Sequence, residues 1–100
     1  MLNNEFNLEI EKSTTKLSGN KLGRQIYEEQ VKGKIDFDKP IRIIFPERID
    51  FLASSFIQGF FYEIVRQIGI RGVEENVQVV AEIPNINEVV RKSLLSVEGV

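Results

Sequence analysis

The sequence predicts an α/β fold: a single small domain in which a mostly parallel sheet packs against helices, in the order β-α-β-α-β-α. Three short stretches rich in apolar and β-branched residues fit strands. Each is followed by a longer segment whose apolar residues recur at spacings of three and four, which is typical of an amphipathic helix. Strands joined by helical connections of this length pair in parallel. No composition shift or repeat divides the chain, so residues 1–100 are expected to form one domain.

The three strands have different characters. Residues 6–10 alternate apolar and polar side chains, as a half-buried strand at a sheet edge does. Residues 41–45, Ile-Arg-Ile-Ile-Phe, are short and mostly apolar, which predicts an interior strand covered on both faces. The third strand is expected at residues 77–83, where Pro84 blocks its extension. A short extra strand at residues 49–52 is a further possibility.

The first and third helices are marked by their ends. Residues 18–20, Ser-Gly-Asn, suit a helix start, because Ser or Asn can accept hydrogen bonds from the free amides of a first turn. Gly33 suits the position just beyond the end of that helix. The last helix is expected to begin at Asn85, with Glu88 three residues on in a capping-box-like arrangement. Its predicted apolar face comprises Ile86, Val89, Val90, Leu94 and Val97.

The second helix follows the apolar turn at residues 49–56 and is expected to run to about Ile68. Ser55 and Gln58 match the Ser-x-x-Gln form of a capping box, which predicts the helix start. Residues 73–76 are interpreted as a polar connection to the next strand. The apolar stripe of this helix should supply much of the core. It consists of Ile57, Phe60, Phe61, Ile64, Val65 and Ile68.

The opposite face of the second helix is the predicted functional surface. At about 100° per residue, a glycine, an amphipathic ring and an arginine fall on this outward side, which suits a protein contact. A phosphoryl group on Ser54 or Ser55 would lie at a helix N-terminus, where free amides and the helix dipole favour negative charge. The predicted outward face consists of Ser55, Gly59, Tyr62, Glu63 and Arg66.

Composition argues against several functions. With no cysteine and no histidine, thiolate chemistry and the commonest general base are absent, so no enzyme, cofactor or metal site is expected. A net charge of −2 disfavours a nucleic-acid surface. Gly19 and Gly23 have three residues between them and Arg24 after them, which does not match a phosphate-binding loop.

There is no run of about 20 apolar residues and no secretory signal pattern. The expected location is therefore the cytoplasm.

Residues 41–45, the turn after them and residues 49–56 with their helix resemble the centre of STAS domains, a family that includes the anti-sigma-factor antagonists. More closely, the chain resembles the small family of STAS-like domain proteins. Those proteins also show a Gly-x-x-Leu/Gly-Arg helix near the start, here residues 19–24, and a Ser-Phe pair, here Ser55-Phe56. The resemblance covers roughly residues 18–95.

The resemblance implies a non-enzymatic, protein-binding switch. Its partner would be a protein such as a histidine-kinase-like ATPase, and the position matched by Ser54 is phosphorylated in some antagonists. Antagonists usually have Asp before that serine and Gly after the serine pair, where this chain has Ala53 and Phe56. The residues expected to bind the partner are Ser54, Ser55, Phe56, Gly59, Tyr62 and Arg66.

Two alternatives remain open from the sequence. The chain could sense a small ligand or nucleotide in a pocket between the start of the first helix and the Ser54 loop. It could also form a dimer, because an exposed first strand invites edge pairing. Phe60 or Tyr62 could contribute to such a contact.

Overall fold

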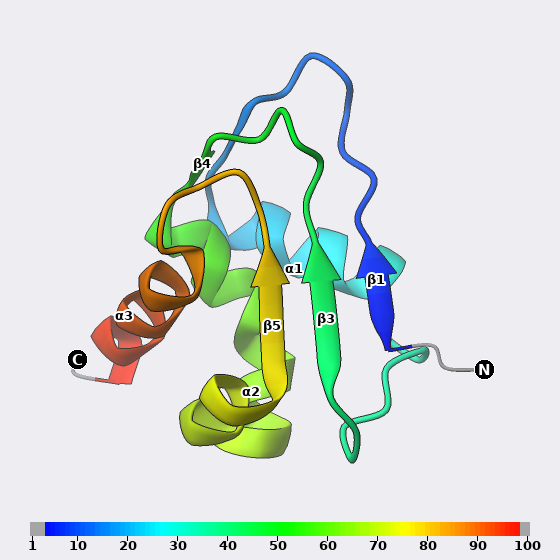
Figure 1. Cartoon of the computed structure of the whole chain (residues 1–100), viewed down its shortest axis with the longest axis vertical. Helices are drawn as coiled ribbons and strands as arrows, with labels where there is room; N and C mark the ends of the chain where they lie inside the picture. The colour runs from blue at the N-terminus through cyan, green and yellow to red at the C-terminus, as the bar shows by residue number, and fades with distance from the viewer. Residues whose placement is uncertain (1–3, 99–100) are drawn as a thin grey trace.

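The main sheet of the protein has three strands, all parallel, in the order β1-β3-β5 (Figure 1). The computed structural model describes residues 4–98, and side chains up to residue 96. β1 is Glu5–Asn7, β3 is Ile41–Ile44 and β5 is Val77–Val80. The predicted α/β class and parallel sheet are confirmed, with β1 at an edge and β3 in the middle. β1 and β5 are each shorter than the sequence predicts.

Three helices accompany the sheet. They are α1, Asn20–Gln30, α2, Ser54–Asn76, and α3, Ile86–Glu98. α1 and α2 cover the face of the sheet that points away from the viewer in Figure 1, and α3 lies beside β5. The strand and helix order predicted from the sequence is therefore present. Among residues 4–98, no helix is both long enough and apolar enough to cross a membrane.

A second, two-stranded parallel ladder lies beyond the carboxyl ends of the main strands. β2, Lys16–Leu17, pairs with β4, Phe51–Leu52. The short extra strand predicted at residues 49–52 is confirmed as β4, whereas its partner β2 was not predicted. The ladder fixes the turn that leads into α2, because the amide of Ala53 donates to the carbonyl of Leu17 at 2.9 Å.

The core lies between the sheet and the α1–α2 layer. Its centre is an aromatic cluster in which Phe60 contacts Tyr27, Phe45, Phe56 and Phe61 at ring-centroid distances of 5.2 to 6.3 Å. Such side chains contribute about 1.5–3 kcal/mol each when fully buried.

The predicted stripe of α2 is confirmed at its four most buried positions, and its last two members are partly buried. The four are Ile57, Phe60, Phe61 and Ile64. A dimer contact through Phe60 is wrong, because this side chain is 0% exposed.

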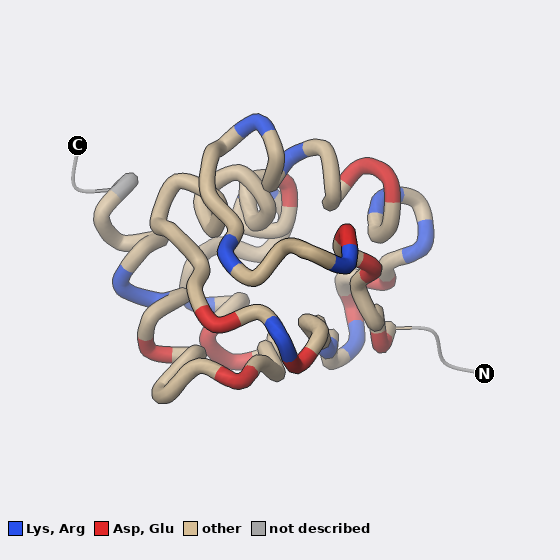
Figure 2. Tube along the Cα trace, turned by 90° about the horizontal axis from the view of Figure 1, so that it is seen from above, with Lys and Arg blue, Asp and Glu red and all other residues tan. Residues whose placement is uncertain are grey.

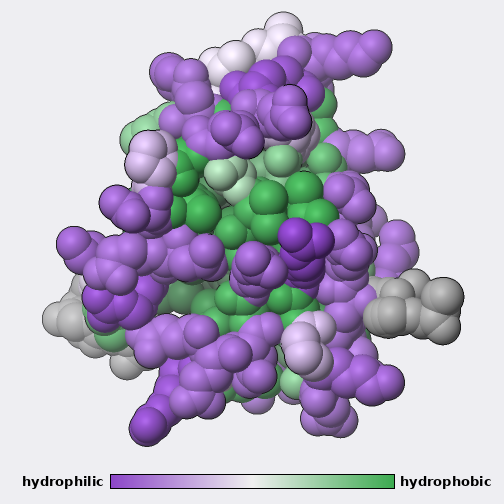
Figure 3. All heavy atoms as spheres, viewed as in Figure 1, coloured by the Kyte–Doolittle hydropathy of each residue, from purple (hydrophilic) through white to green (hydrophobic). Residues whose placement is uncertain are grey.

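Only one face of the sheet is covered, so the prediction that β3 is covered on both faces is wrong. Ile41 and Ile43 point into the core, whereas Arg42 is exposed and Ile44 is half-buried on the other side. Both crossover helices pass on the same face, and this leaves the other face open. Figure 3 shows this open face, where apolar surface appears between polar side chains.

α2 is longer than predicted and contains a break at Gly69, whose φ of 76° and ψ of 167° are not helical. The helix resumes and runs to Asn76, so the interpretation of residues 73–76 as a polar connection is wrong. Val73 is buried, and this single apolar anchor holds the last turn against the core. The carbonyl of Val73 also accepts from the amide of Val77, which joins the helix end directly to β5.

Two of the three helix starts differ from the sequence prediction in how they are capped, and the third agrees with it. α1 follows Gly19, whose φ of 99° suits glycine, and has no side-chain cap from Ser or Asn. α2 follows Ala53 and also lacks a side-chain cap, so the Ser-x-x-Gln capping box is wrong. α3 begins where predicted: the carbonyl of Asn85 accepts from the amides of Glu88 and Val89 at 3.0 Å. The predicted apolar face of α3 is buried or half-buried from Ile86 to Leu94, and the side chain of Val97 lies outside the described residues.

Candidate partner-binding surface

The α1–α2 contact sets the geometry of the candidate surface. The two helices cross at Gly23 and Gly59, where their backbones approach closely. A Cβ at Gly59 would lie 2.1 Å from the carbonyl oxygen of Asn20, and a Cβ at Gly23 would lie 2.3 Å from that of Phe56. Gly59 is therefore buried between helices, and its predicted place on the outward face is wrong. A helical wheel gives the direction of a residue but not which neighbour it meets.

Ser55 and Phe56 are also structural. Ser55 is half-buried, and its Oγ accepts from the amide of Gly19 at 2.9 Å, which ties the start of α2 to the start of α1. Phe56 is 1% exposed and packs against Phe45 and Phe60. The predicted partner contact of Phe56 is therefore wrong, because its side chain is buried in the core, whereas Ser55 is half-buried and bonded to Gly19. Together with Gly59, they position the start of α2.

Ser54 lies on a different side of α2, facing α3. Ser54 as a whole is exposed to solvent, but its Oγ shares a hydrogen bond with the Oγ of Ser93 at 3.2 Å. Gln58 donates from Nε2 to the carbonyl of Ser93, also at 3.2 Å. Ser93 is only 5% exposed. Ser54 thus borders a polar seam between α2 and α3, which the sequence did not reveal.

The outer side of the α1–α2 pair carries a cluster that we call the Tyr62 cluster: Tyr62, Arg24 and Arg66. Tyr62 is 42% exposed. The guanidinium carbon of Arg24, from α1, lies 4.4 Å from the ring centroid of Tyr62, and that of Arg66 lies 5.7 Å away. Nη1 of Arg66 also donates to the Tyr62 hydroxyl at 3.4 Å. Such cation–π pairs are favourable by about 0.5–1 kcal/mol at exposed sites.

The predicted site residues therefore divide into three groups. Tyr62 and Arg66 come together on the outer surface, joined by Arg24 of α1, which was not among the predicted site residues. Ser54 faces α3, and the other three predicted residues are packed inside. Contact between residues on two helices, such as Arg24 and Tyr62, has no signal in a single helical pattern.

Beside this surface, burial raises the pKa of Tyr27 above its ordinary 10.0, and the charge of Glu63 adds to the effect. Tyr27 is almost fully buried on α1 and packs edge-on against Phe60. Glu63 follows Tyr62 on α2, and its charge acts on this buried hydroxyl. Tyr27 is thus a neutral core residue at physiological pH.

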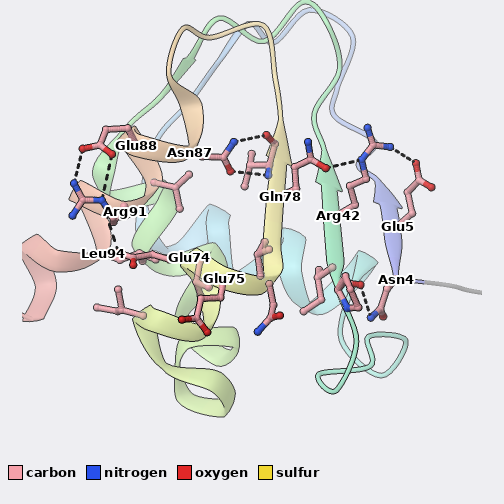
Figure 4. A pocket seen from close by; sticks show the side chains of 18 residues that line it. Asn4, Glu5, Arg42, Glu74, Glu75, Gln78, Asn87, Glu88, Arg91 and Leu94 are labelled. Atoms are coloured by element: carbon pink, nitrogen blue, oxygen red, sulfur yellow. Dashed lines mark hydrogen bonds and ion pairs between the residues drawn. The ribbon is translucent and has the colours of Figure 1, made fainter.

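The open face of the sheet holds a broad depression with a volume of about 770 Å³. Figure 4 shows α3 and the last turn of α2 on one side of it and a cross-strand row of polar residues on the other. In this row Arg42 donates to Glu5 at 3.0 Å and to Gln78 at 3.2 Å. On α3, Glu88 binds Arg91, and this hydrogen bond lowers the pKa of Glu88.

Charges of both signs are interspersed around the molecule (Figure 2). Among the side chains that the structure describes, those of residues 4–96, no group of three or more carboxylates is placed to hold a metal ion. Comparison with protein-family models, curated proteins and solved structures found no match for this chain.

Proposed function

We propose that this chain is a cytoplasmic, non-enzymatic STAS-like regulatory domain that binds a protein partner through the Tyr62 cluster. The observation that carries the proposal is the cluster itself: an exposed aromatic ring flanked by two guanidinium groups from two helices. Tyr and Arg are the residue types that, with Trp, most often dominate the binding energy of protein interfaces.

The rigidity of the support favours the same function. Arg24 follows Gly23, and Tyr62 lies less than one turn beyond Gly59, so the cluster is built directly on the close helix crossing. A surface fixed in this way loses little conformational entropy when a partner binds. The resemblance to STAS-like proteins adds the class of partner, a histidine-kinase-like ATPase.

Phosphorylation of Ser54 is the proposed regulation of this surface. The residue is exposed at the first position of α2, where a phosphoryl group would meet free amides of the first turn. Its hydroxyl faces Ser93 and α3 rather than Tyr62. We expect Ser54→Glu to weaken partner binding while Ser54→Ala and the exposed control Ser96→Glu leave it unchanged. Equal binding by all three variants would remove the phosphoswitch from the proposal.

The alternative of a small-ligand sensor lacks its predicted site. The start of α1 and the Ser54 loop are in direct contact, since the Gly19 amide reaches Ser55 Oγ at 2.9 Å and Gly59 touches Asn20. These contacts favour the partner-binding proposal over a nucleotide site between the two segments. Thermal-shift measurements with nucleotides test the alternative, because a ligand that binds the native state raises its apparent stability.

Affinity capture followed by direct binding tests the proposal. The protein is used to capture partners from a lysate of the cells that produce it, and a captured protein is then purified and titrated. We expect Tyr62→Ala to weaken its binding at least about tenfold, as is typical of a dominant interface residue. The matched control is Phe51→Ala, because Phe51 is an exposed aromatic residue on β4, 49% exposed. Unchanged binding by Tyr62→Ala would contradict the proposal.

A further inference from the structure

Arg24 and Arg66 differ from the other arginines of the protein in having no carboxylate partner among the described side chains, those of residues 4–96, and no carbonyl partner among residues 4–98. The chain has six arginines, and the remaining four are each engaged by oxygen atoms of the fold. These contacts are Arg42 with Glu5, Arg71 with Glu75, Arg91 with Glu74 and Glu88, and Arg48 with the carbonyls of Ile10 and Glu11. The two arginines without such contacts are the two that flank Tyr62.

The stacked geometry leaves these guanidinium groups able to bind. A guanidinium that lies against an aromatic ring keeps its N–H edge free, and that edge matches a carboxylate in a bidentate pair. Arg24 lies 4.4 Å from the Tyr62 ring centroid, and Arg66 reaches the Tyr62 hydroxyl. The ring therefore holds two positive charges near one another, and no described carboxylate forms an ion pair with either.

We infer that the partner presents a carboxylate-rich protein segment to the Tyr62 cluster. The inference rests on the proposed function and adds the chemistry of the partner. Charge complementarity carries it: two unpaired guanidinium groups attract acidic side chains and repel basic ones. Nucleic acid fits less well, because its binding depends on Lys and Arg side chains that neutralise many phosphates, and this protein carries a net charge of −2.

A peptide titration tests the inference without the natural partner. The probe is a fluorescent Asp/Glu-rich peptide, and a Lys-rich peptide and a single-stranded oligonucleotide of matched length serve as comparisons. Fluorescence anisotropy is measured at low and moderate salt with the wild type and with Arg24→Gln, Arg66→Gln and Arg71→Gln. Arg71→Gln is the matched control, because it removes one positive charge from an exposed arginine already paired with Glu75.

We expect the acidic peptide to bind, with an affinity that falls as salt rises, and the Lys-rich peptide not to bind. Arg24→Gln and Arg66→Gln should each weaken binding by about three- to tenfold, the usual range for a specific charge contact. Arg24→Lys should recover only part of the loss, because an ammonium neither stacks nor binds in bidentate fashion. Arg71→Gln should change the affinity less than twofold.

Three results would overturn the inference: no binding of the acidic peptide, an equal loss with Arg71→Gln, or tighter binding of the oligonucleotide. Its failure is distinguishable from failure of the proposed function. If a captured partner requires Tyr62 but binds Arg24→Gln and Arg66→Gln normally, the surface is correct and the acidic chemistry is wrong. If the partner does not require Tyr62, the proposed function itself fails.

Discussion

Gly59 shows how a single residue can decide the arrangement of two helices. A Cβ added at Gly59 would lie 2.1 Å from the carbonyl oxygen of Asn20 and 2.9 Å from the Cα of Asn20. Both are backbone atoms that cannot move independently of α1. We expect Gly59→Ala to lower the free energy of unfolding by about 1–3 kcal/mol, the usual cost of overpacking. Chemical denaturation of the wild type and the variant measures this difference in the free energy of unfolding.

The control for this prediction is Gly72→Ala, which adds the same atom to the same helix. There the added Cβ would lie 2.7 Å from the Cβ of Ile68, so some strain is expected, but the clash is with a side chain of the same helix and not with the backbone of α1. The gain in helix propensity, about 1 kcal/mol, offsets part of any strain. An equal loss of stability in both variants would show that the α1–α2 crossing is not the cause.

Tyr27 gives the protein a predictable sensitivity to high pH. Burial raises the pKa of its hydroxyl in the folded state, so above pH 10.0 the unfolded chain loses the proton more readily. The unfolded state then binds fewer protons, and the free energy of unfolding falls as pH rises. Denaturation curves between neutral pH and pH values above 10.0 should show this fall in the wild type and a smaller one in Tyr27→Phe. Identical pH profiles would contradict the prediction.

Residue roles were predictable from the sequence where they depend on local periodicity and not where they depend on a neighbour. The buried stripe of α2 follows from apolar spacing alone, and Ile57 and Ile64 lie where the pattern places them. Ser55 has the residue type of a helix cap, but its hydroxyl serves an amide on another helix. Tyr62 was recognised as exposed, whereas its contact with Arg24 requires the α1–α2 packing.

At the scale of elements, side-chain amides close the sheet edges. The side chain of Asn87, on α3, accepts from the amide of Val79 on β5 at 3.0 Å and donates to the Val79 carbonyl at 3.2 Å. Beyond β1, Gln30 makes the same pair of hydrogen bonds with Glu9. Asn87 takes the place of a further strand beside β5, and both amides occupy backbone groups that another chain could otherwise bind.

Asn87→Ala tests this closure. The substitution leaves a partly buried donor and acceptor without partners, and each such group costs about 1–3 kcal/mol. Because both groups are only partly buried and water can reach them, we expect a total loss of about 1–3 kcal/mol and faster hydrogen exchange at the Val79 amide. Gln30→Ala is the comparison: its hydrogen bonds are exposed, so water can replace them and the loss should be smaller. A reversed order would contradict the explanation.

The break in α2 was half predictable. The sequence places a helix end near Gly69, and the backbone leaves helical geometry there. The following turn was missed because its glutamates and Gly72 resemble a loop. A single buried residue, Val73, holds that turn in a helix, and one apolar position is too little to establish a period.

On the scale of the whole molecule, the open sheet face is the main departure from expectation. All-parallel sheets are usually covered on both sides, and an apolar β3 strengthened that expectation. The polar residue within the strand, Arg42, was the contrary signal. It forms the centre of the row that links Glu5 on β1 to Gln78 on β5. Ile44 and Val80 lie on the same open face, half-buried.

We expect this polar row to keep the open face from associating with other copies. The double substitution Arg42→Val and Gln78→Val joins the row to the apolar surface of Ile44 and Val80, giving a larger exposed patch of the kind that drives association. Valine is a good strand former, so the sheet should persist. Sedimentation velocity should then show oligomers that increase with protein concentration.

The control is Lys92→Val on the exposed side of α3, which also removes a polar side chain but lies outside the sheet. It should sediment as the wild type does. Circular dichroism should show that the double variant keeps its helices, so that association is not a consequence of unfolding. If the folded double variant sediments as the wild type at every concentration, the row has no protective role, and Ile44 and Val80 are too recessed to form a contact.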